Sequence, residues 1–397
     1  MREILFLSHR IPFPPDRGDK IRAHHVLKHL ATRARVHLVT FADTPGDLGH
    51  DVEVARHCAS HSIVWRGKTR ARAAVEALAT GRPVSLAAFS HLAVREAVDA
   101  VVGSRPIDTI FLYSSQMAQY LPAGFEGRVV MDFCDMDSAK FTAYADGASP
   151  AMAWLMRREG RLLEAFDRQI AERADTSLFV SEGEAALFRT RTGAPRVSVM
   201  ENGIDTDFYD PAAEYERRDE AAPLIVFTGQ MDYRPNIEAA RWFAQRVLPG
   251  IRGRHPTARF AVVGRAPTEA VRALASQPGV VVTGEVPDIR AWLAAAQVVV
   301  APLTIARGVQ NKVLEAMAMA RPVVASIAAA DGIDHRGTIR VAGDADAFIT
   351  QTLALIADPG AIGPAARAQV QARYGWAARL APLDTLLEFD APRRDAA

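Results

Sequence analysis

The chain has 397 residues, of which 49% are hydrophobic and 23% charged, with a formal net charge of +1. This length and balance predict a globular protein of two domains. The near-neutral charge argues against nucleic-acid binding, for which a strongly basic face is expected. The two cysteines, Cys58 and Cys134, form no disulfide framework and fit a reducing cytoplasm. No apolar run predicts a signal peptide or a membrane-spanning helix.

The first half alternates short apolar runs with helical segments. It opens with "ILFLS", which predicts a strand buried on both faces of a parallel sheet. A proline-rich loop, "RIPFPPDRGDK", and a segment with apolar residues near helical spacing, "IRAHHVLKHLA", follow. Further strand-like runs are "VHLVTF", "SIVW", "TIFLYS" and "VVMDF". Strands alternating with helices predict the α/β class with a doubly wound parallel sheet.

The second half repeats this pattern. Its strand-like runs are "LIVFTG", "RFAVVG", "VVVTG", "VVVAPL" and "PVVAS". Helices are expected at about 236–248, 267–276, 288–296 and 310–320. Three of the strands end in glycine, at Gly229, Gly264 and Gly284. Because ligands of open α/β sheets bind at the carboxyl ends of strands, these glycines indicate either close approach of a ligand or simple tight turns.

The most informative segment is 301–326, "APLTIARGVQNKVLEAMAMARPVVAS". A helix is expected to start near Gln310, and its N-terminus would offer unpaired N–H groups to an anion such as a diphosphate. Asn311 and Glu315 lie four residues apart on one helix face. Lys312 is a cation at the end of a helix that disfavours cations, unless an anion binds there. Glu315 could accept both hydroxyls of a ribose, although a solvated Lys312–Glu315 pair is the alternative.

"GVQNKVLEAMAMARPVVAS" resembles the donor-binding signature of the GT-B glycosyltransferases of family 4. "FTGQMDYRPNIEAARWF", "VVVTGEVPDIRAWLAAAQVVVAPL" and "ENGIDTDFYDP" resemble other parts of that family, and "SLFVSEGEAALF" resembles the strand and helix before the last of these. "SHRIPFPPDRGDKIRAHHVLKHLA" and "MDFCDMDSAKFTAYA" resemble sugar transferases of exopolysaccharide and PEP-CTERM (exosortase) systems. The resemblance implies two Rossmann-like domains facing across a cleft. These are an acceptor domain over 1–205, a donor domain over 206–375, and a helix over 376–397 that crosses back and ends in a tail.

The resemblance also implies roles in donor binding. Glu315 would bind the ribose, while Gly308, Val309 and Gln310 would face the donor sugar and the diphosphate. Arg307 stands where the family has a glutamate that touches the sugar, which suggests a charged donor sugar or a phosphate contact.

The family's β-phosphate ligands, an Arg and a Lys after the glycine that matches Gly229, are replaced here by Gln230 and Asn236. Arg234 and Lys312 are then the available cations, since a leaving diphosphate needs positive charge or oriented dipoles.

On the acceptor side, Arg17, Gly18, Asp19 and Lys20 match the family's glycine-bearing loop, with an exposed charged turn as the alternative. Asp135 falls close to the place of a sugar-contacting histidine and is the catalytic candidate. Between residues 56 and 106, Arg and Lys outnumber Asp and Glu. That excess could contact anionic lipid headgroups or form a solvated basic face.

The resemblance therefore implies transfer of a sugar from a UDP- or GDP-sugar to a polysaccharide or lipid-linked saccharide, with retention of configuration. We expect no cofactor, no bound metal and no nucleic-acid partner. We expect a cytoplasmic protein in peripheral contact with the inner face of the cytoplasmic membrane. A nucleotide-sugar epimerase of the same fold and a non-catalytic nucleotide-sugar-binding scaffold are the alternatives.

Overall fold

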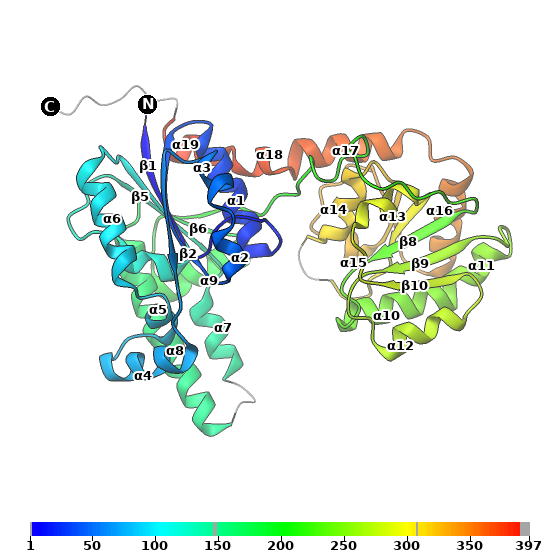
Figure 1. Cartoon of the computed structure of the whole chain (residues 1–397). Coiled ribbons are helices and arrows are strands. Elements are labelled where there is room, and N and C mark those ends of the chain that lie inside the picture. The colour runs from blue at the N-terminus through cyan, green and yellow to red at the C-terminus, as the bar shows by residue number, and fades with distance from the viewer. Residues whose placement is uncertain (1, 146–148, 307–308, 390–397) are drawn as a thin grey trace. The chain divides into compact units, whose positions relative to one another are not determined.

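The computed structural model describes residues 2–145, 149–306 and 309–389. The chain divides into two compact units, Met1–Asn202 together with Arg379–Ala397, and Gly203–Ala378. Each unit contains one parallel β-sheet with helices packed on it (Figure 1). Within the described ranges, no helix has both the length and the apolar character that crossing a membrane would require.

The first unit is built on a seven-stranded sheet with the order β3-β2-β1-β4-β5-β6-β7. Its strands are β1 (Glu3–Ser8), β2 (Arg35–Ala42), β3 (Ser60–Trp65), β4 (Thr109–Tyr113), β5 (Arg128–Cys134), β6 (Thr176–Phe179) and β7 (Val197–Val199). Every residue of β1 and β4 is buried, as expected for strands covered on both faces. The strand order reverses between β1 and β4, and open α/β sheets bind ligands at such a reversal.

The helices of the first unit connect these strands. They are α1 (Gly18–Ala31), α2 (Pro45–Leu48), α3 (Asp51–Ala55), α4 (Arg70–Thr80), α5 (Val84–Ala88), α6 (Leu92–Ser104), the 3-10 turn η1 (Ser115–Tyr120), α7 (Asp137–Tyr144), α8 (Pro150–Arg173) and α9 (Glu182–Thr192). A buried ion pair fixes α1 to the sheet: Arg22 Nε donates to Asp132 Oδ2 at 2.8 Å and Nη2 donates to Oδ1 at 3.1 Å.

The second unit has a six-stranded sheet with the order β10-β9-β8-β11-β12-β13. Its strands are β8 (Leu224–Thr228), β9 (Arg259–Val263), β10 (Val280–Gly284), β11 (Val298–Ala301), β12 (Val323–Ser326) and β13 (Arg340–Ala342). Here the order reverses between β8 and β11. Both units therefore have the doubly wound topology that the alternation of strands and helices predicts.

The helices of the second unit likewise connect its strands. They are α10 (Arg234–Trp242), a π-helical turn η2 (Phe243–Val247), α11 (Leu248–Arg252), α12 (Glu269–Arg272), the 3-10 turn η3 (Ala273–Ser276), α13 (Ile289–Ala295), α14 (Asn311–Ala318), α15 (Ile327–Ala330), α16 (Ala345–Ala357) and α17 (Ile362–Arg373). The helix expected at about 236–248 is thus continued through the π turn to Arg252.

The last residues of the chain belong to the first unit. Helix α18 (Trp376–Leu380) crosses the boundary between the units, and α19 (Pro382–Leu386) lies within the first. Asp384 Oδ1 lies 2.8 Å from His29 Nε2, and Arg128 Nη1 donates to the Leu386 carbonyl at 2.7 Å. These contacts tie α19 to the first domain.

Two strands were not expected from the sequence, β7 and β13. Each has three residues and lies at an edge of its sheet, so neither carries a long apolar run. The stretch 205–223, which lies between β7 and β8, contains no helix or strand. It is nevertheless anchored, because Tyr209 and Tyr215 pack against the core of the second unit.

Candidate functional site

A pocket of about 570 Å³ lies at the carboxyl edge of the second sheet. It is formed by the segments that follow β8, β9, β10 and β11, together with the start of α14. Its lining residues are Thr228, Gly229, Gln230, Tyr233, Pro235, Asn236, Gly264, Arg265, Glu285, Val286, Ile289, Leu303, Ile305, Ala306, Val309, Gln310, Asn311, Lys312 and Glu315. The pocket therefore opens where the strand order reverses, which is the expected place for a ligand in an open α/β sheet.

At this edge two lining residues, Gly229 and Gly264, have no side chain between their backbone and the pocket. A Cβ added to Gly264 would lie 1.7 Å from the Gly229 carbonyl oxygen, closer than any two such atoms can approach. A Cβ added to Gly229 would lie 2.8 Å from Asn236 Nδ2 and 3.2 Å from Lys312 Nζ. Any other residue at either position would push the strand ends apart or fill the pocket.

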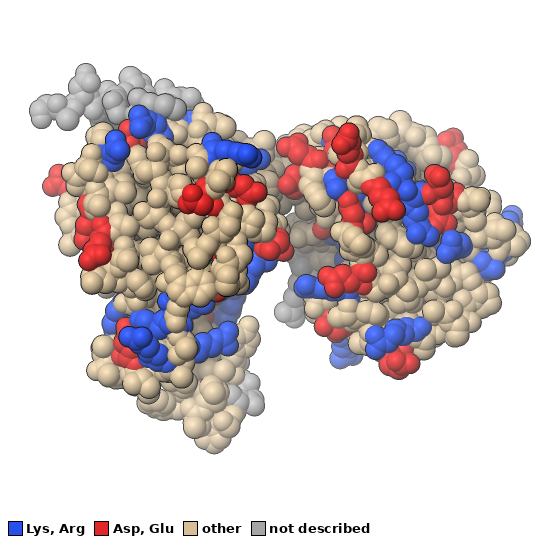
Figure 2. Space-filling model, viewed as in Figure 1, with Lys and Arg blue, Asp and Glu red and all other residues tan. Residues whose placement is uncertain are grey.

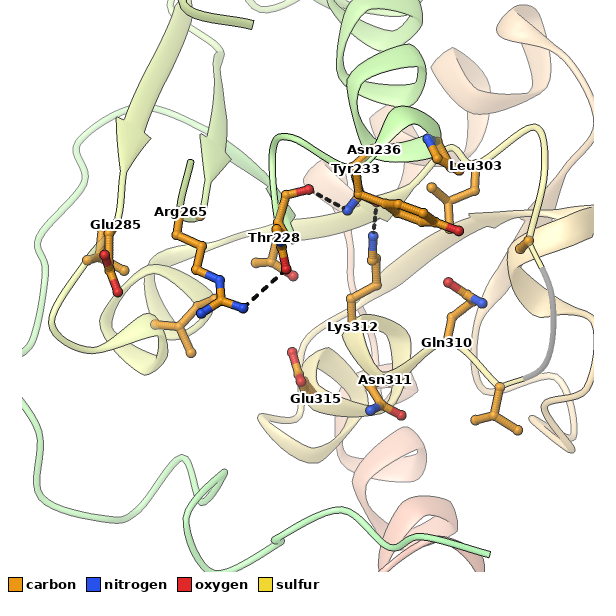
Figure 3. Close-up of a pocket in the computed structure, with 18 of the residues that line it drawn as sticks. Thr228, Tyr233, Asn236, Arg265, Glu285, Leu303, Gln310, Asn311, Lys312 and Glu315 are labelled. Atoms are coloured by element: carbon orange, nitrogen blue, oxygen red, sulfur yellow. Dashed lines mark hydrogen bonds between the residues drawn. The ribbon is translucent and has the colours of Figure 1, made fainter. Parts of the chain in front are cut away.

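Helix α14 points its first turn at the pocket. Val313, Leu314 and Met317 are buried against the domain core, and this anchors the helix. Lys312 and Glu315 lie in the pocket wall (Figure 3). Among the described residues, no side chain caps the start of α14. Its first N–H groups and the positive end of its dipole therefore make this end suitable for an anion.

Lys312 is held in place by polar and aromatic groups. Its ammonium donates to Asn236 Oδ1 (Figure 3) and lies 4.7 Å from the centroid of the Phe227 ring. Asn236 is buried, and its Nδ2 donates to the Gln230 carbonyl at 2.8 Å. Within the described part of the chain, no carboxylate forms an ion pair with Lys312. Burial lowers the pKa of Lys312 to about 8, against the opposing effect of Glu315.

Glu315 lies one turn further along α14. Burial raises the pKa of its carboxyl group, while the Tyr209 hydroxyl and the Lys312 charge favour the ionised form. Tyr209 comes from the 205–223 stretch, whose role in the site the sequence did not suggest. The Glu315 carboxylate can still accept hydrogen bonds from hydroxyl groups of a ligand. Such bonds would favour its ionised form.

The structure brings most of the expected donor residues together. Gly229, Asn236, Val309, Gln310, Asn311, Lys312 and Glu315 all line the pocket. Arg307 and Gly308 lie outside the described residues. Arg234 is not in the lining: its side chain is 86% exposed and its Nε donates to Glu238 at 2.7 Å.

Another cation, Arg265, lines the pocket in a position that sequence reasoning missed. Its Nη2 donates to Gln230 Oε1 at 3.2 Å (Figure 3). Glu285 lies at the same end of the pocket (Figure 3). Arg265 directly follows Gly264, and Glu285 directly follows Gly284. The position after a strand-ending glycine was therefore the signal available in the sequence.

A second pocket, of about 360 Å³, lies in the first unit at the carboxyl edge of its sheet. Gly18, Asp19 and Asp135 are in its lining, and so are His9 and Arg22, which the sequence did not single out.

The other two residues of the expected acceptor loop do not line this pocket. Lys20 is buried and its Nζ lies 2.8 Å from Asp47 Oδ1. Arg17 Nε lies 2.8 Å from Asp19 Oδ1. Asp135 Oδ2 lies 2.8 Å from Lys140 Nζ.

Asp19 is surrounded by cations. Arg10 and Arg17 form ion pairs with it, and His9 Nε2 lies 3.5 Å from its Oδ2. Burial alone would raise the pKa of Asp19, but these partners hold it far below its ordinary value. Burial lowers the pKa of His9, with Asp19 opposing, so this pocket presents an ionised carboxylate beside an imidazole that favours its neutral form.

Comparison with known proteins agrees with this architecture. Residues 222–358 match the family model described as Glycosyl transferases group 1. That segment contains every residue that lines the larger pocket. A comparison with curated proteins gave no match.

Solved structures with similar folds cover both units. Sucrose-phosphate synthase from Thermosynechococcus elongatus is 19% identical, with a TM-score of 0.60 and coverage of 98% of each chain. A glycosyltransferase from Rickettsia africae is 13% identical, with a TM-score of 0.62 and coverage of 99% of each chain. Anabaena HepE in complex with UDP-glucose is 16% identical, with a TM-score of 0.58 and coverage of 98% of this chain and 100% of that one. The chain therefore has the GT-B fold, and part of its second domain matches the group 1 glycosyltransferase model.

Proposed function

We propose that this protein transfers a sugar from a nucleoside diphosphate donor, bound in the second domain, to a saccharide acceptor. The observation that carries the proposal is Lys312. It is a partly desolvated cation beside the backbone of Gly229, at the N-terminus of α14. Among the described residues, no carboxylate forms an ion pair with it and no side chain caps that helix end. Such a group is unfavourable in the empty pocket and becomes favourable when a diphosphate neutralises it.

The remaining lining residues suggest how the donor lies. The diphosphate would contact Lys312 and the first N–H groups of α14, and Glu315 would accept hydrogen bonds from the ribose hydroxyls. Arg265 would supply the second positive charge near the diphosphate, in place of the exposed Arg234. The resemblance to family 4 and the match to the group 1 model support this arrangement. The similarity to HepE, whose structure was solved in complex with UDP-glucose, supports a UDP-sugar as the first donor to test.

In the proposed reaction the bond between the anomeric carbon and the diphosphate oxygen breaks. A bond from the anomeric carbon to an acceptor hydroxyl oxygen forms on the same face. The acceptor proton passes to the departing diphosphate oxygen, so no protein nucleophile is needed. Lys312, Arg265 and the helix dipole would stabilise the charge that develops on the leaving group.

The pocket of the first unit is the proposed acceptor site. Its carboxylates, Asp19 and Asp135, are suited to accept hydrogen bonds from sugar hydroxyls. The resemblance of the first half to exopolysaccharide and PEP-CTERM sugar transferases supports a polysaccharide or lipid-linked saccharide as acceptor. A lipid-linked acceptor would bring the reaction to the inner face of the cytoplasmic membrane.

The test is a turnover assay with UDP- and GDP-sugars and a mixture of saccharide acceptors, in which the released nucleoside diphosphate is measured. Acceptor-dependent release and a longer saccharide support the proposal, and the anomeric configuration of the product by NMR tests retention. An altered free sugar that forms without acceptor would replace the proposal with an epimerase. A donor that binds and is never consumed would replace it with a scaffold.

A matched pair of variants tests the second cation. We expect Arg265→Ala to weaken nucleoside diphosphate binding by about 1–2 kcal/mol, as for a hydrogen bond to a charged group near the surface. Arg234→Ala removes an equally charged side chain and should leave the affinity unchanged. Equal losses in both variants, measured by calorimetry, would contradict the role of Arg265.

A further inference from the structure

Helix α4 of the first unit turns its larger apolar side chains to solvent. Val75 is 70% exposed and Leu78 is 52% exposed. The opposite face buries only alanines, Ala73 and Ala77, in a small cluster with α5. An ordinary surface helix has the reverse arrangement, with its larger apolar residues toward the core.

Helix α8 adds an aromatic side chain next to α4. Arg158 Nη2 donates to the Ala77 carbonyl at 3.1 Å and Nη1 donates to the Arg82 carbonyl at 3.2 Å, so the N-terminal half of α8 lies beside the C-terminal end of α4. Trp154 is one turn before Arg158 and therefore projects from the same side of α8. Its side chain is 58% exposed.

The charges around these apolar residues are positive and unpaired. Arg70, Arg72 and Arg157 are exposed, and among the described residues none of them has an ion-pair partner. The acidic residues of the same segments are already occupied. Glu76 pairs with Lys68 at 2.8 Å, and buried Glu159 accepts the Val84 and Ser85 N–H groups at the start of α5. Figure 2 shows Lys and Arg gathered over α4.

We infer that this surface docks the protein on an anionic lipid bilayer. The α4–α8 surface consists of Arg70, Arg72, Val75, Leu78, Trp154 and Arg157. Exposed aliphatic side chains can enter the boundary between headgroups and acyl chains, and tryptophan favours that depth. Arginines at the rim are attracted to anionic headgroups. An acidic protein partner would satisfy the arginines, but it would not account for an aliphatic and aromatic surface exposed between them as directly as a bilayer does.

The inference stands on this surface and does not depend on the donor pocket. It is tested with the full chain by sedimentation with vesicles of phosphatidylcholine alone and of phosphatidylcholine mixed with phosphatidylglycerol. We expect binding to the anionic vesicles, little binding to the neutral ones, and weaker binding at high salt because salt screens the attraction.

The first variant removes two charges, Arg70→Gln with Arg72→Gln. It should lower the partition coefficient for anionic vesicles by about 25-fold, because each arginine contributes about fivefold. The control is Arg246→Gln with Arg254→Gln, which removes the same charge from two exposed arginines of the second unit and should bind as the wild type does. Turnover of a soluble donor and acceptor should be unchanged in both, which separates lipid binding from the proposed catalysis.

The second variant, Val75→Ser with Leu78→Ser, keeps every charge and should also reduce vesicle binding several-fold. Thermal unfolding checks that each variant is folded. Absence of binding to anionic vesicles would overturn the inference, as would equal losses in the control and the arginine variant. If the serine variant instead abolished self-association without any effect of lipid, the surface would be an interface between copies and not a membrane contact.

Discussion

Replacement of Lys312 by glutamine tests the account of the donor pocket through pH. The pKa of Lys312 in the empty protein is about 8 because burial disfavours its charge. At pH 7 it is mostly protonated and can contact a diphosphate, and at pH 9 it is mostly neutral. Binding of the anion raises the pKa of Lys312, so the wild-type affinity should fall as pH rises through 8, by about tenfold between pH 7 and pH 9.

The variant has no charge to lose at this position. At pH 7 we expect Lys312→Gln to weaken nucleoside diphosphate binding by about 1.5–3 kcal/mol, the usual contribution of a hydrogen bond to a charged group. Its affinity should vary much less between pH 7 and pH 9. Lys312→Arg serves as the control, since arginine keeps its charge over this range. Isothermal titration calorimetry gives these affinities, and a wild-type slope that persists in Lys312→Gln would refute the assignment.

Three further predictions concern binding and stability. Glu315→Ala should weaken nucleotide binding by about 1–3 kcal/mol in a protein that still folds, and unchanged affinity by calorimetry would exclude the ribose role. Gly264→Ala should reduce the free energy of unfolding by at least about 1–3 kcal/mol, because its Cβ would overlap the Gly229 carbonyl; an unchanged urea midpoint would contradict this packing. Arg22→Met should cost about 3–5 kcal/mol by leaving buried Asp132 without its partner, and denaturant titration measures that loss.

The fold could be predicted well from local pattern. Strands such as "ILFLS" and "LIVFTG" are continuous apolar runs, and parallel sheets bury both faces of their strands. The order of strands and helices then allows few arrangements. The three-residue strands β7 and β13 could not be found in this way, because they depend on pairing with a neighbour and not on their own side chains.

The donor site was predictable where neighbouring residues share one element. Asn311, Lys312 and Glu315 lie within two turns of α14, so helix geometry brings them to the same pocket. Arg265 and Tyr209 approach it from separate segments, and only the three-dimensional fold places them there.

Arg234 was also predicted as a donor residue, and it does not line the pocket. It was chosen for its charge near "MDYRPN", and the helical spacing that pairs it with Glu238 turns it to solvent. On the acceptor side, Lys20 was expected in a loop rich in charges but lies in the first turn of α1, and its neutralisation by Asp47 depends on a residue 27 positions away. Charge in a loop is therefore weaker evidence for a site than position on a helix that follows a strand.

The most direct test of the central claim is calorimetric titration of the wild-type protein with UDP, GDP and ADP and with their common sugar conjugates. We expect selective binding of one nucleoside diphosphate, tighter binding with a sugar attached, and weaker binding of both ligands by Glu315→Ala. If Glu315→Ala and Lys312→Gln both bound that nucleotide with the affinity of the wild type, the assignment of the pocket would be contradicted. No binding of any nucleotide or nucleotide sugar to the folded protein would contradict the proposed donor class itself.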